Sequence, residues 1–197
     1  MELLDVSRSL VTVIDLQGKL MEMIHRPKLV IGATGRLMRL ADLFGVPVVL
    51  TEQYPRGLGL THPEVRGVYD GLKTPKLFLE KTSFGCCGDD RFERVLDELR
   101  PADTAGPRQV VVAGIEAHVC VMATVVELIR RGHVVHVCWE CVSSRGEEYR
   151  RHALERMQQA GAILTNHESV AFEWARHKDH PQFKAVNAIL REGQLAE

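Results

Sequence analysis

The sequence lacks the features that would place it in a membrane, in a secreted disulfide framework or on nucleic acid. Its apolar runs are far shorter than the roughly 20 residues that a membrane-spanning helix needs. Lys and Arg number 25 against 26 Asp and Glu, a formal net charge of −1, so no positive field would attract nucleic acid or anionic lipid. The five cysteines form an odd set, which is typical of reduced thiols inside cells.

These absences predict a cytoplasmic protein without a membrane or nucleic-acid partner. The first residues contain Glu2 and Asp5 and resemble neither a signal peptide nor a mitochondrial transit peptide. A near-neutral net charge suits a protein that acts on a small molecule.

Short apolar stretches alternate with helical patterns along the 197 residues, a length that suits one domain. The stretches recur about every 25 to 35 residues, the length of a βαβ unit. Most are apolar on both faces, as parallel strands between two layers of helices are. The pattern predicts one domain over 1–197, an α/β protein with a mostly parallel, Rossmann-like sheet in a three-layer α/β/α sandwich. The expected strands lie at 10–14, 46–50, 76–79, 110–113, 134–138 and 162–164, and the expected helices at 30–44, 121–129, 149–160 and 183–190.

The segment 51–75 interrupts this alternation because it is rich in Gly and Pro, which exclude a long helix. A connection of this length is usually a lid or an interface, and a plain surface loop is the alternative.

Three reactive side chains follow predicted strands: Asp15, Lys81 and Cys120. Ligands of open parallel sheets bind beyond the carboxyl ends of the strands, so we expect the acid, the amine and the thiol at one edge. Cys120 also opens the helix expected at 121–129, where the helix dipole and unpaired N–H groups favour a thiolate and can stabilise an oxyanion. The pattern predicts Cys120 as nucleophile, Asp15 as general base and then acid, and Lys81 as electrostatic partner. The alternative is that Asp15 is a turn residue, Lys81 a solvated charge and Cys120 an inert buried thiol.

Longer strings carry a resemblance to a known family. They are VPVVLTEQYP at 46–55, GLG at 57–59, KTSF at 81–84, GIEAHVC at 114–120 and HPQFK at 180–184. The chain resembles the isochorismatase-like cysteine hydrolase superfamily, and within it the short isochorismatase-domain-containing proteins. The resemblance implies a six-stranded parallel sheet and an Asp–Lys–Cys triad of Asp15, Lys81 and Cys120. It also implies a non-proline cis peptide bond at Ile115–Glu116 that turns backbone N–H groups towards the oxyanion.

Departures from the family pattern narrow the expected chemistry. Nicotinamidases carry an Asp-x-His…His metal site after the second strand, whereas 51–55 reads TEQYP here and His62 stands alone. We therefore expect neither a metal nor another cofactor, which argues against nicotinamide as the substrate. True isochorismatases lack the cysteine, so Cys120 argues against their vinyl-ether chemistry. The resemblance predicts a metal-independent hydrolase of a small amide, carbonyl or imine compound, acting on a non-peptide C–N bond, and a homo-oligomer of at least two copies.

Four further residues are candidates for substrate binding. Gln17, two residues after Asp15, is expected to hold Asp15 or the substrate, and a surface amide is the alternative. Tyr54 and Phe84 are expected to wall the pocket, although single aromatic residues belong more often to the core. His118, two residues before the cysteine, is expected to have a peripheral polar role.

Other functions compete with hydrolysis. A binding or scaffold protein on the same fold, with a silent triad, is the main alternative. A thiol redox protein would use Cys138 and Cys141, but Cys138 lies in a predicted strand and not at a helix N-terminus. A zinc site that adds Cys86 and Cys87 lacks the usual ligand spacing. A nuclease is disfavoured because the sequence shows neither an acidic metal cluster nor a basic groove.

Overall fold

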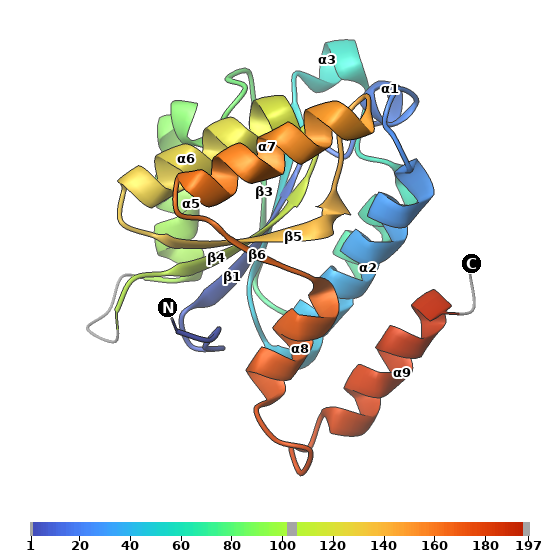
Figure 1. The fold of residues 1–197 in the computed structure, drawn as a ribbon, viewed down its shortest axis with the longest axis vertical. Helices are drawn as coiled ribbons and strands as arrows, with labels where there is room; N and C mark the ends of the chain where they lie inside the picture. The colour runs from blue at the N-terminus through green and yellow to red at the C-terminus, as the bar shows by residue number, and fades with distance from the viewer. Residues whose placement is uncertain (1, 102–105, 195–197) are drawn as a thin grey trace.

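The structure, a computed structural model, describes residues 2–101 and 106–194, and a parallel six-stranded sheet forms its centre (Figure 1). The strand order is β3-β2-β1-β4-β5-β6, so the chain starts in the middle and builds one half of the sheet and then the other. The strands are β1 (Ser9–Ile14), β2 (Val48–Gln53), β3 (Lys76–Lys81), β4 (Gln109–Gly114), β5 (Val134–Val142) and β6 (Ile163–Thr165).

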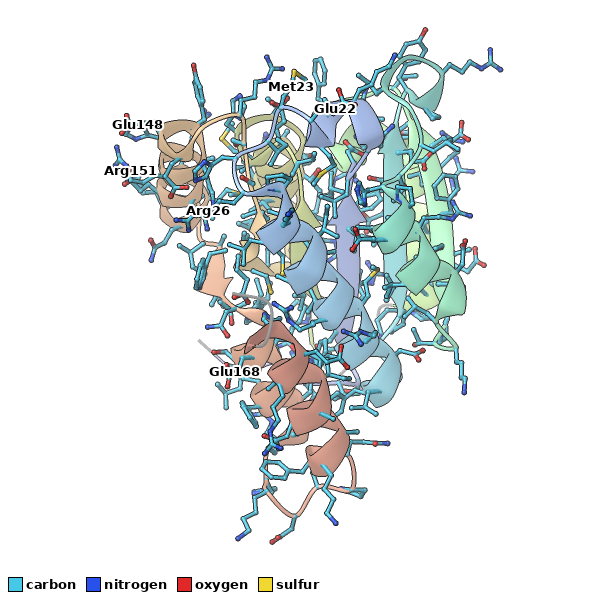
Figure 2. All side chains as sticks on the ribbon, turned by 90° about the vertical axis from the view of Figure 1, so that its right-hand side faces the viewer. Glu22, Met23, Arg26, Glu148, Arg151 and Glu168 are labelled. Carbon is cyan, nitrogen blue, oxygen red and sulfur yellow. The ribbon has the colours of Figure 1, made fainter. Side chains whose placement is uncertain are left out.

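Helices cover both faces of the sheet, so the predicted three-layer α/β/α sandwich is confirmed (Figure 1). One face carries α2, α4, α8 and α9, with α2 packed between α4 and α9 (Figure 2), and the other carries α5, α6 and α7. Within the described residues, no helix has the length and apolar character needed to cross a membrane. The helices are α1 (Gly18–Met21), α2 (Pro27–Phe44), α3 (Pro55–Leu58), α4 (Pro63–Gly71), α5 (Asp90–Leu99), α6 (Met122–Arg130), α7 (Glu147–Gln159), α8 (His167–Ala175) and α9 (Phe183–Gln194), with a 3₁₀ turn at Cys86–Gly88 and a π-helical turn at Ala117–Val121.

Each face of the sheet has its own apolar core. Every residue of β1, β2 and β4 is buried, as expected for central parallel strands that are covered on both sides. Leu37 and Leu40 of α2 fill one core, and Phe92 and Leu96 of α5 contribute to the other. Burying one such side chain contributes about 1.5–3 kcal/mol, so the two cores hold the strands in register.

The segment 51–75 differs from the loop that its composition suggests. Its first residues extend β2 to Gln53, and the rest contains α3 and the nine-residue helix α4, each of which starts at a proline. Proline suits the first turn of a helix because the N–H that it lacks has no partner there. The helices α5 and α8 were also not predicted, although Phe92 and Leu96 of α5 lie at helical spacing and are both buried.

The strand order changes direction between β1 and β4. These two strands approach each other so closely at their carboxyl ends that a Cβ atom on Gly114 would lie 2.2 Å from the carbonyl oxygen of Ile14. Gly114 also has a φ of +136°, so only glycine fits this position. Open parallel sheets bind ligands beyond the carboxyl ends of the strands at such a point, and the residues that follow β1 and β4 lie there.

Candidate active site

Asp15 and Lys81 form a buried ion pair at the carboxyl end of the sheet. Oδ2 of Asp15 lies 2.6 Å from Nζ of Lys81, and both side chains are fully buried. Oδ1 of Asp15 accepts a hydrogen bond of 2.7 Å from the hydroxyl of Thr51. Asp15 directly follows β1 and has a φ of +54°, a left-handed conformation that Asp adopts more readily than most residues. Lys81 ends β3, so its side chain reaches past β2 to meet the carboxylate.

The ammonium group of Lys81 is surrounded by acceptors. Besides Asp15, it contacts Oε1 of Gln53 at 2.9 Å and the carbonyl oxygens of Ser83 at 3.1 Å and Phe84 at 2.9 Å. An ammonium group carries three hydrogens, so none is left for a substrate. Lys81 therefore acts on Asp15 by charge and holds the turn at 83–84.

Cys120 lies in the π-helical turn between β4 and α6, and it is 5% exposed. Its carbonyl oxygen accepts a hydrogen bond of 2.7 Å from the hydroxyl of Thr124. Burial raises the pKa of the Cys120 thiol to about 12; the negative charge of Asp15 adds to the rise and Lys81 opposes it. The thiol is therefore close enough to the ion pair for both charges to act on its pKa.

The expectation that a helix N-terminus favours the thiolate of Cys120 is wrong for the resting protein. The helix α6 begins only at Met122, and the sulfur is buried, so the cost of desolvating a thiolate prevails. The resting group is a neutral thiol next to a carboxylate. This arrangement suits transfer of the thiol proton to Asp15 during attack.

The residues between β4 and Cys120 form a tightly bonded turn. The peptide bond between Ile115 and Glu116 is cis, at the position that the family resemblance implies. The N–H of Ile115 donates to the carbonyl of Ile14 at 2.9 Å, and the carbonyl of Glu116 accepts from the N–H of Val121 at 3.2 Å. These hydrogen bonds fix the course of the backbone at Cys120.

Gln17 is fully buried, so the alternative that it is a surface amide is wrong. Its Nε2 donates to the carbonyls of Gln53 at 3.1 Å and Gly59 at 2.6 Å, and its Oε1 accepts from the N–H of Gln53 at 2.7 Å. Both amide hydrogens are used inside the protein. Gln17 thus joins the end of β2 to the segment after α3, and a contact with substrate stays a prediction that these bonds do not favour.

Tyr54 and Phe84 are 54% and 66% exposed, so the alternative that they belong to the core is wrong. Tyr54 lines a cavity of about 370 Å³ together with Arg56 and Lys81, at the edge of the sheet formed by β3. Phe84 gives its carbonyl oxygen to Lys81 and leaves its ring exposed. Both rings are therefore available to a ligand.

His118 lies on the side of the π-helical turn that faces α7. Its Nδ1 is 3.0 Å from the hydroxyl of Ser144, and its ring stacks on Tyr149 with 5.0 Å between centroids. With Tyr149 and Met122 it lines a separate cavity of about 440 Å³. This position agrees with a peripheral polar role.

The competing metal and redox sites find little support in the geometry. Among residues 2–101 and 106–194, no three His, Cys, Asp or Glu side chains are grouped so that they could hold a metal ion. Glu52 instead accepts hydrogen bonds of 2.7 Å from the N–H and the hydroxyl of Thr61. Cys138 and Cys141 are both free and fully buried in β5. Neither thiol has the partial exposure that a redox cysteine needs.

Sequence reasoning missed Thr51 and Gln53, the two side chains of β2 that contact the ion pair. A signal existed, because three polar residues in succession end an otherwise apolar strand at 51–53. All three are buried, and buried polar side chains need hydrogen-bond partners.

Comparisons with known proteins agree with this fold. The isochorismatase domain matches residues 9–169. Isochorismatase domain-containing protein 1 of Danio rerio is 38% identical over 164 residues, 82% of this chain and 53% of that protein, so the chain spans about half of its length. A solved structure of the MAR1 ribonuclease from Caenorhabditis elegans is 35% identical, with a TM-score of 0.85 over 96% of this chain and 93% of that one. The YcaC gene product of Escherichia coli, described as an octameric hydrolase of unknown specificity, shares the fold, with a TM-score of 0.79 and 21% identity over 99% of this chain and 98% of that one. The chain belongs to the isochorismatase family.

Proposed function

We propose that the protein is a metal-independent cysteine hydrolase in which Cys120 attacks the carbon of a small amide, carbonyl or imine compound, most naturally at a non-peptide C–N bond. The observation that carries the proposal is the buried Asp15–Lys81 ion pair beside the Cys120 thiol, at the carboxyl end of a parallel sheet. Membership of a family that consists largely of hydrolases supports it.

The proposed reaction begins when Asp15 accepts the Sγ proton of Cys120 while the sulfur attacks the carbonyl carbon. The raised pKa of Cys120 makes the free thiolate scarce at neutral pH, so an adjacent base is required. The electron pair of the C=O bond moves to oxygen, where the backbone N–H of Cys120 stabilises the negative charge. The C–N bond then breaks, the amine leaves with the proton from Asp15, and a thioester remains.

Water completes the cycle in the proposed second half. Asp15 takes a proton from water, the oxygen attacks the thioester carbon, and the S–C bond breaks. The carboxylic acid leaves, and the sulfur of Cys120 regains its proton. Lys81 stays charged throughout. It stabilises Asp15 whenever Asp15 is a carboxylate, before the sulfur attacks and again after the amine has left.

Exposed aromatic rings indicate the kind of substrate. Tyr54 and Phe84 lie in the segments that follow β2 and β3, and both rings are open to solvent. We assign them to the apolar part of a small substrate, and we leave His118 outside the substrate site because it lines a separate cavity.

The proposal is tested by a screen of small amides, esters and imines with the wild type and with Cys120→Ser. Hydrolysis that depends on Cys120 and persists in EDTA supports a metal-independent hydrolase. A folded protein without Cys120-dependent turnover supports the scaffold alternative. RNA belongs in the screen because the C. elegans neighbour is described as a ribonuclease; RNA cleavage that survives in Cys120→Ser would contradict the proposed chemistry.

We also propose that the protein is a homo-oligomer. The YcaC gene product, which shares this fold, is described as octameric, and this supports self-association as a property of the fold. Multi-angle light scattering at micromolar concentration tests it: a mass of two or more copies of the 22.1 kDa chain is expected, and a monomer contradicts it.

A further inference from the structure

Three consecutive residues of the loop between β5 and α7 hold three consecutive residues of the turn before Cys120. The contacts involve a backbone hydrogen bond, a side-chain hydrogen bond and an ion pair. They join the carbonyl of Ser143 to the N–H of Ala117 at 2.7 Å, the hydroxyl of Ser144 to Nδ1 of His118 at 3.0 Å, and Nε of Arg145 to Oε1 of Glu116 at 2.6 Å. We call this set of contacts the 116–145 clamp.

The ion pair of the clamp is asymmetric in its exposure. The side chain of Glu116 is 8% exposed, whereas that of Arg145 is 57% exposed. A second nitrogen of Arg145, Nη2, lies 3.3 Å from Oε2 of Glu116, so the guanidinium contacts both carboxylate oxygens. A buried carboxylate needs such a partner, and contact with both oxygens fixes its orientation as well as its charge. Arg145 therefore determines where Glu116 lies.

Glu116 in turn determines the course of the chain at the nucleophile. Its carbonyl oxygen accepts hydrogen bonds from the N–H groups of Val119 at 3.0 Å and Val121 at 3.2 Å, the two neighbours of Cys120 in sequence. A displacement of residue 116 would shift both N–H groups and the turn that they define.

The loop that carries Arg145 is itself fixed on its other side. The hydroxyl of Ser143 donates to the carbonyl of His25 at 2.6 Å, and the N–H of His25 donates to the carbonyl of Ser144 at 2.8 Å. The clamp therefore connects the turn at Cys120 to His25, just before α2, through a loop that is hydrogen-bonded on both sides. Rigid support of this kind is what holds reacting groups in a productive geometry.

We propose that Arg145 is a positioning residue for acyl transfer: through Glu116 it fixes the turn so that the backbone N–H of Cys120 receives the oxyanion. The inference rests on the proposed function and adds a residue outside the triad. It concerns only the step in which a carbonyl oxygen becomes negative. Direct reaction of the sulfur with an alkyl halide forms no oxyanion and does not need the clamp.

The test compares two reactions of Cys120 in the same protein, each followed by peptide mass spectrometry. With p-nitrophenyl acetate, the S–C bond forms, the C–O bond to p-nitrophenolate breaks, and the thiol proton passes to Asp15. With iodoacetamide, the thiol proton passes to solvent, the S–C bond forms and iodide leaves, without an oxyanion. In Arg145→Ala we expect the ratio of acetylation to alkylation rates to fall about 10- to 100-fold, because misplaced groups lose much of their effect on a transition state.

Further variants separate positioning from general destabilisation. Glu116→Gln should lower the ratio as Arg145→Ala does, the double variant should lower it no further, and Arg145→Lys should restore part of it. The matched control is Arg151→Ala: Arg151 projects outward from α7 and pairs with Glu155 at 2.7 Å, so its loss should leave both rates unchanged (Figure 2).

Each outcome decides the inference. A wild type that acetylates Cys120 and an Arg145→Ala variant with an unchanged ratio would overturn it and leave the proposed function standing. Absence of acetylation at Cys120 in the folded wild type would overturn the proposed function, and the inference with it.

Discussion

The Nζ atom of Lys81 lies 2.6 Å from Oδ2 of Asp15, and both side chains are fully buried although they come from strands that are separated by β2. A buried ion pair adds little net stability, because desolvation offsets the attraction between the charges. Here β2 supplies a hydroxyl from Thr51 to the carboxylate and an amide oxygen from Gln53 to the ammonium. The number of partners assembled around one pair supports a role in chemistry.

Removing one charge of this pair should lower the free energy of unfolding more than removing both charges. Lys81→Met leaves the carboxylate of Asp15 buried without its counter-charge, and we expect a loss of about 3–5 kcal/mol in the free energy of unfolding. The double variant Asp15→Asn/Lys81→Met should recover most of this loss. Urea denaturation followed by circular dichroism measures the free energy of unfolding. Lys19→Met, at an exposed lysine, serves as control. Equal losses in the single and double variants would contradict the electrostatic account.

Asp15→Asn should affect alkylation and hydrolysis in opposite directions. Because burial and Asp15 raise the pKa of Cys120 to about 12, alkylation of the wild type by iodoacetamide should keep accelerating above pH 9. Removing the negative charge lowers that pKa, so alkylation at pH 8 should become faster. Hydrolysis should fall about 10²–10⁴-fold because the proton acceptor is lost. A wild-type alkylation profile that levels off near the ordinary thiol pKa of about 8.5 would contradict this prediction.

Thr51 and Thr12 offer a matched pair of substitutions in neighbouring strands, since both are fully buried. Thr51→Val removes the hydrogen bond to Asp15 and should lower the free energy of unfolding by about 1.5–3 kcal/mol, the usual range for a hydrogen bond to a charged group. The hydroxyl of Thr12 has no hydrogen-bond partner among the described residues, so Thr12→Val should be neutral or stabilising. Thermal unfolding of both variants gives the comparison, and similar losses would argue against a special role for Thr51.

His136 should make the fold less stable in acid. It is buried in β5, its ring nitrogens meet no hydrogen-bond partner in the described part of the chain, and burial lowers its pKa to about 4. The unfolded chain binds a proton below pH ~6.5, whereas the folded protein does not until about pH 4. Stability is therefore fully present above pH ~6.5 and falls by about 3 kcal/mol as the pH drops towards 4.

The variant His136→Leu isolates this effect. The difference between its unfolding free energies at pH 7 and pH 4.5 should be smaller than in the wild type, while His152→Gln, at an exposed histidine of α7, should leave the wild-type difference intact. If His136→Leu keeps the full pH dependence, the cause lies in other groups.

The parallel topology explains why much of the site could be predicted from the sequence. Apolar runs mark the strands, and parallel strands end at one edge, so residues as distant as Asp15 and Lys81 were expected together. The same reasoning could not supply Thr51 and Gln53, because their role depends on which buried side chains face one another across the sheet. The contact between Arg145 and Glu116 joins two loops, and loop courses do not follow from periodicity.

The protonation state of Cys120 shows a second limit of the sequence. The position of a cysteine before a helix is visible in the sequence, but the burial of its sulfur is not. The α-helix begins at Met122, one residue later than expected, after a π-helical turn, and the thiol is 5% exposed. Desolvation therefore reverses the predicted direction of the pKa shift.

The role of Cys120 as nucleophile is tested most directly by the mass of the protein during turnover of an amide or ester found in the screen. Acid quenching should trap a species heavier by the acyl group of the substrate. Peptide mapping should place that group on Cys120 in the wild type. The Cys120→Ser variant should carry none, and the Asp15→Asn variant should accumulate it more slowly. The account would be contradicted if Cys120→Ser turned over the substrate at the wild-type rate, or if the acyl group mapped to another residue.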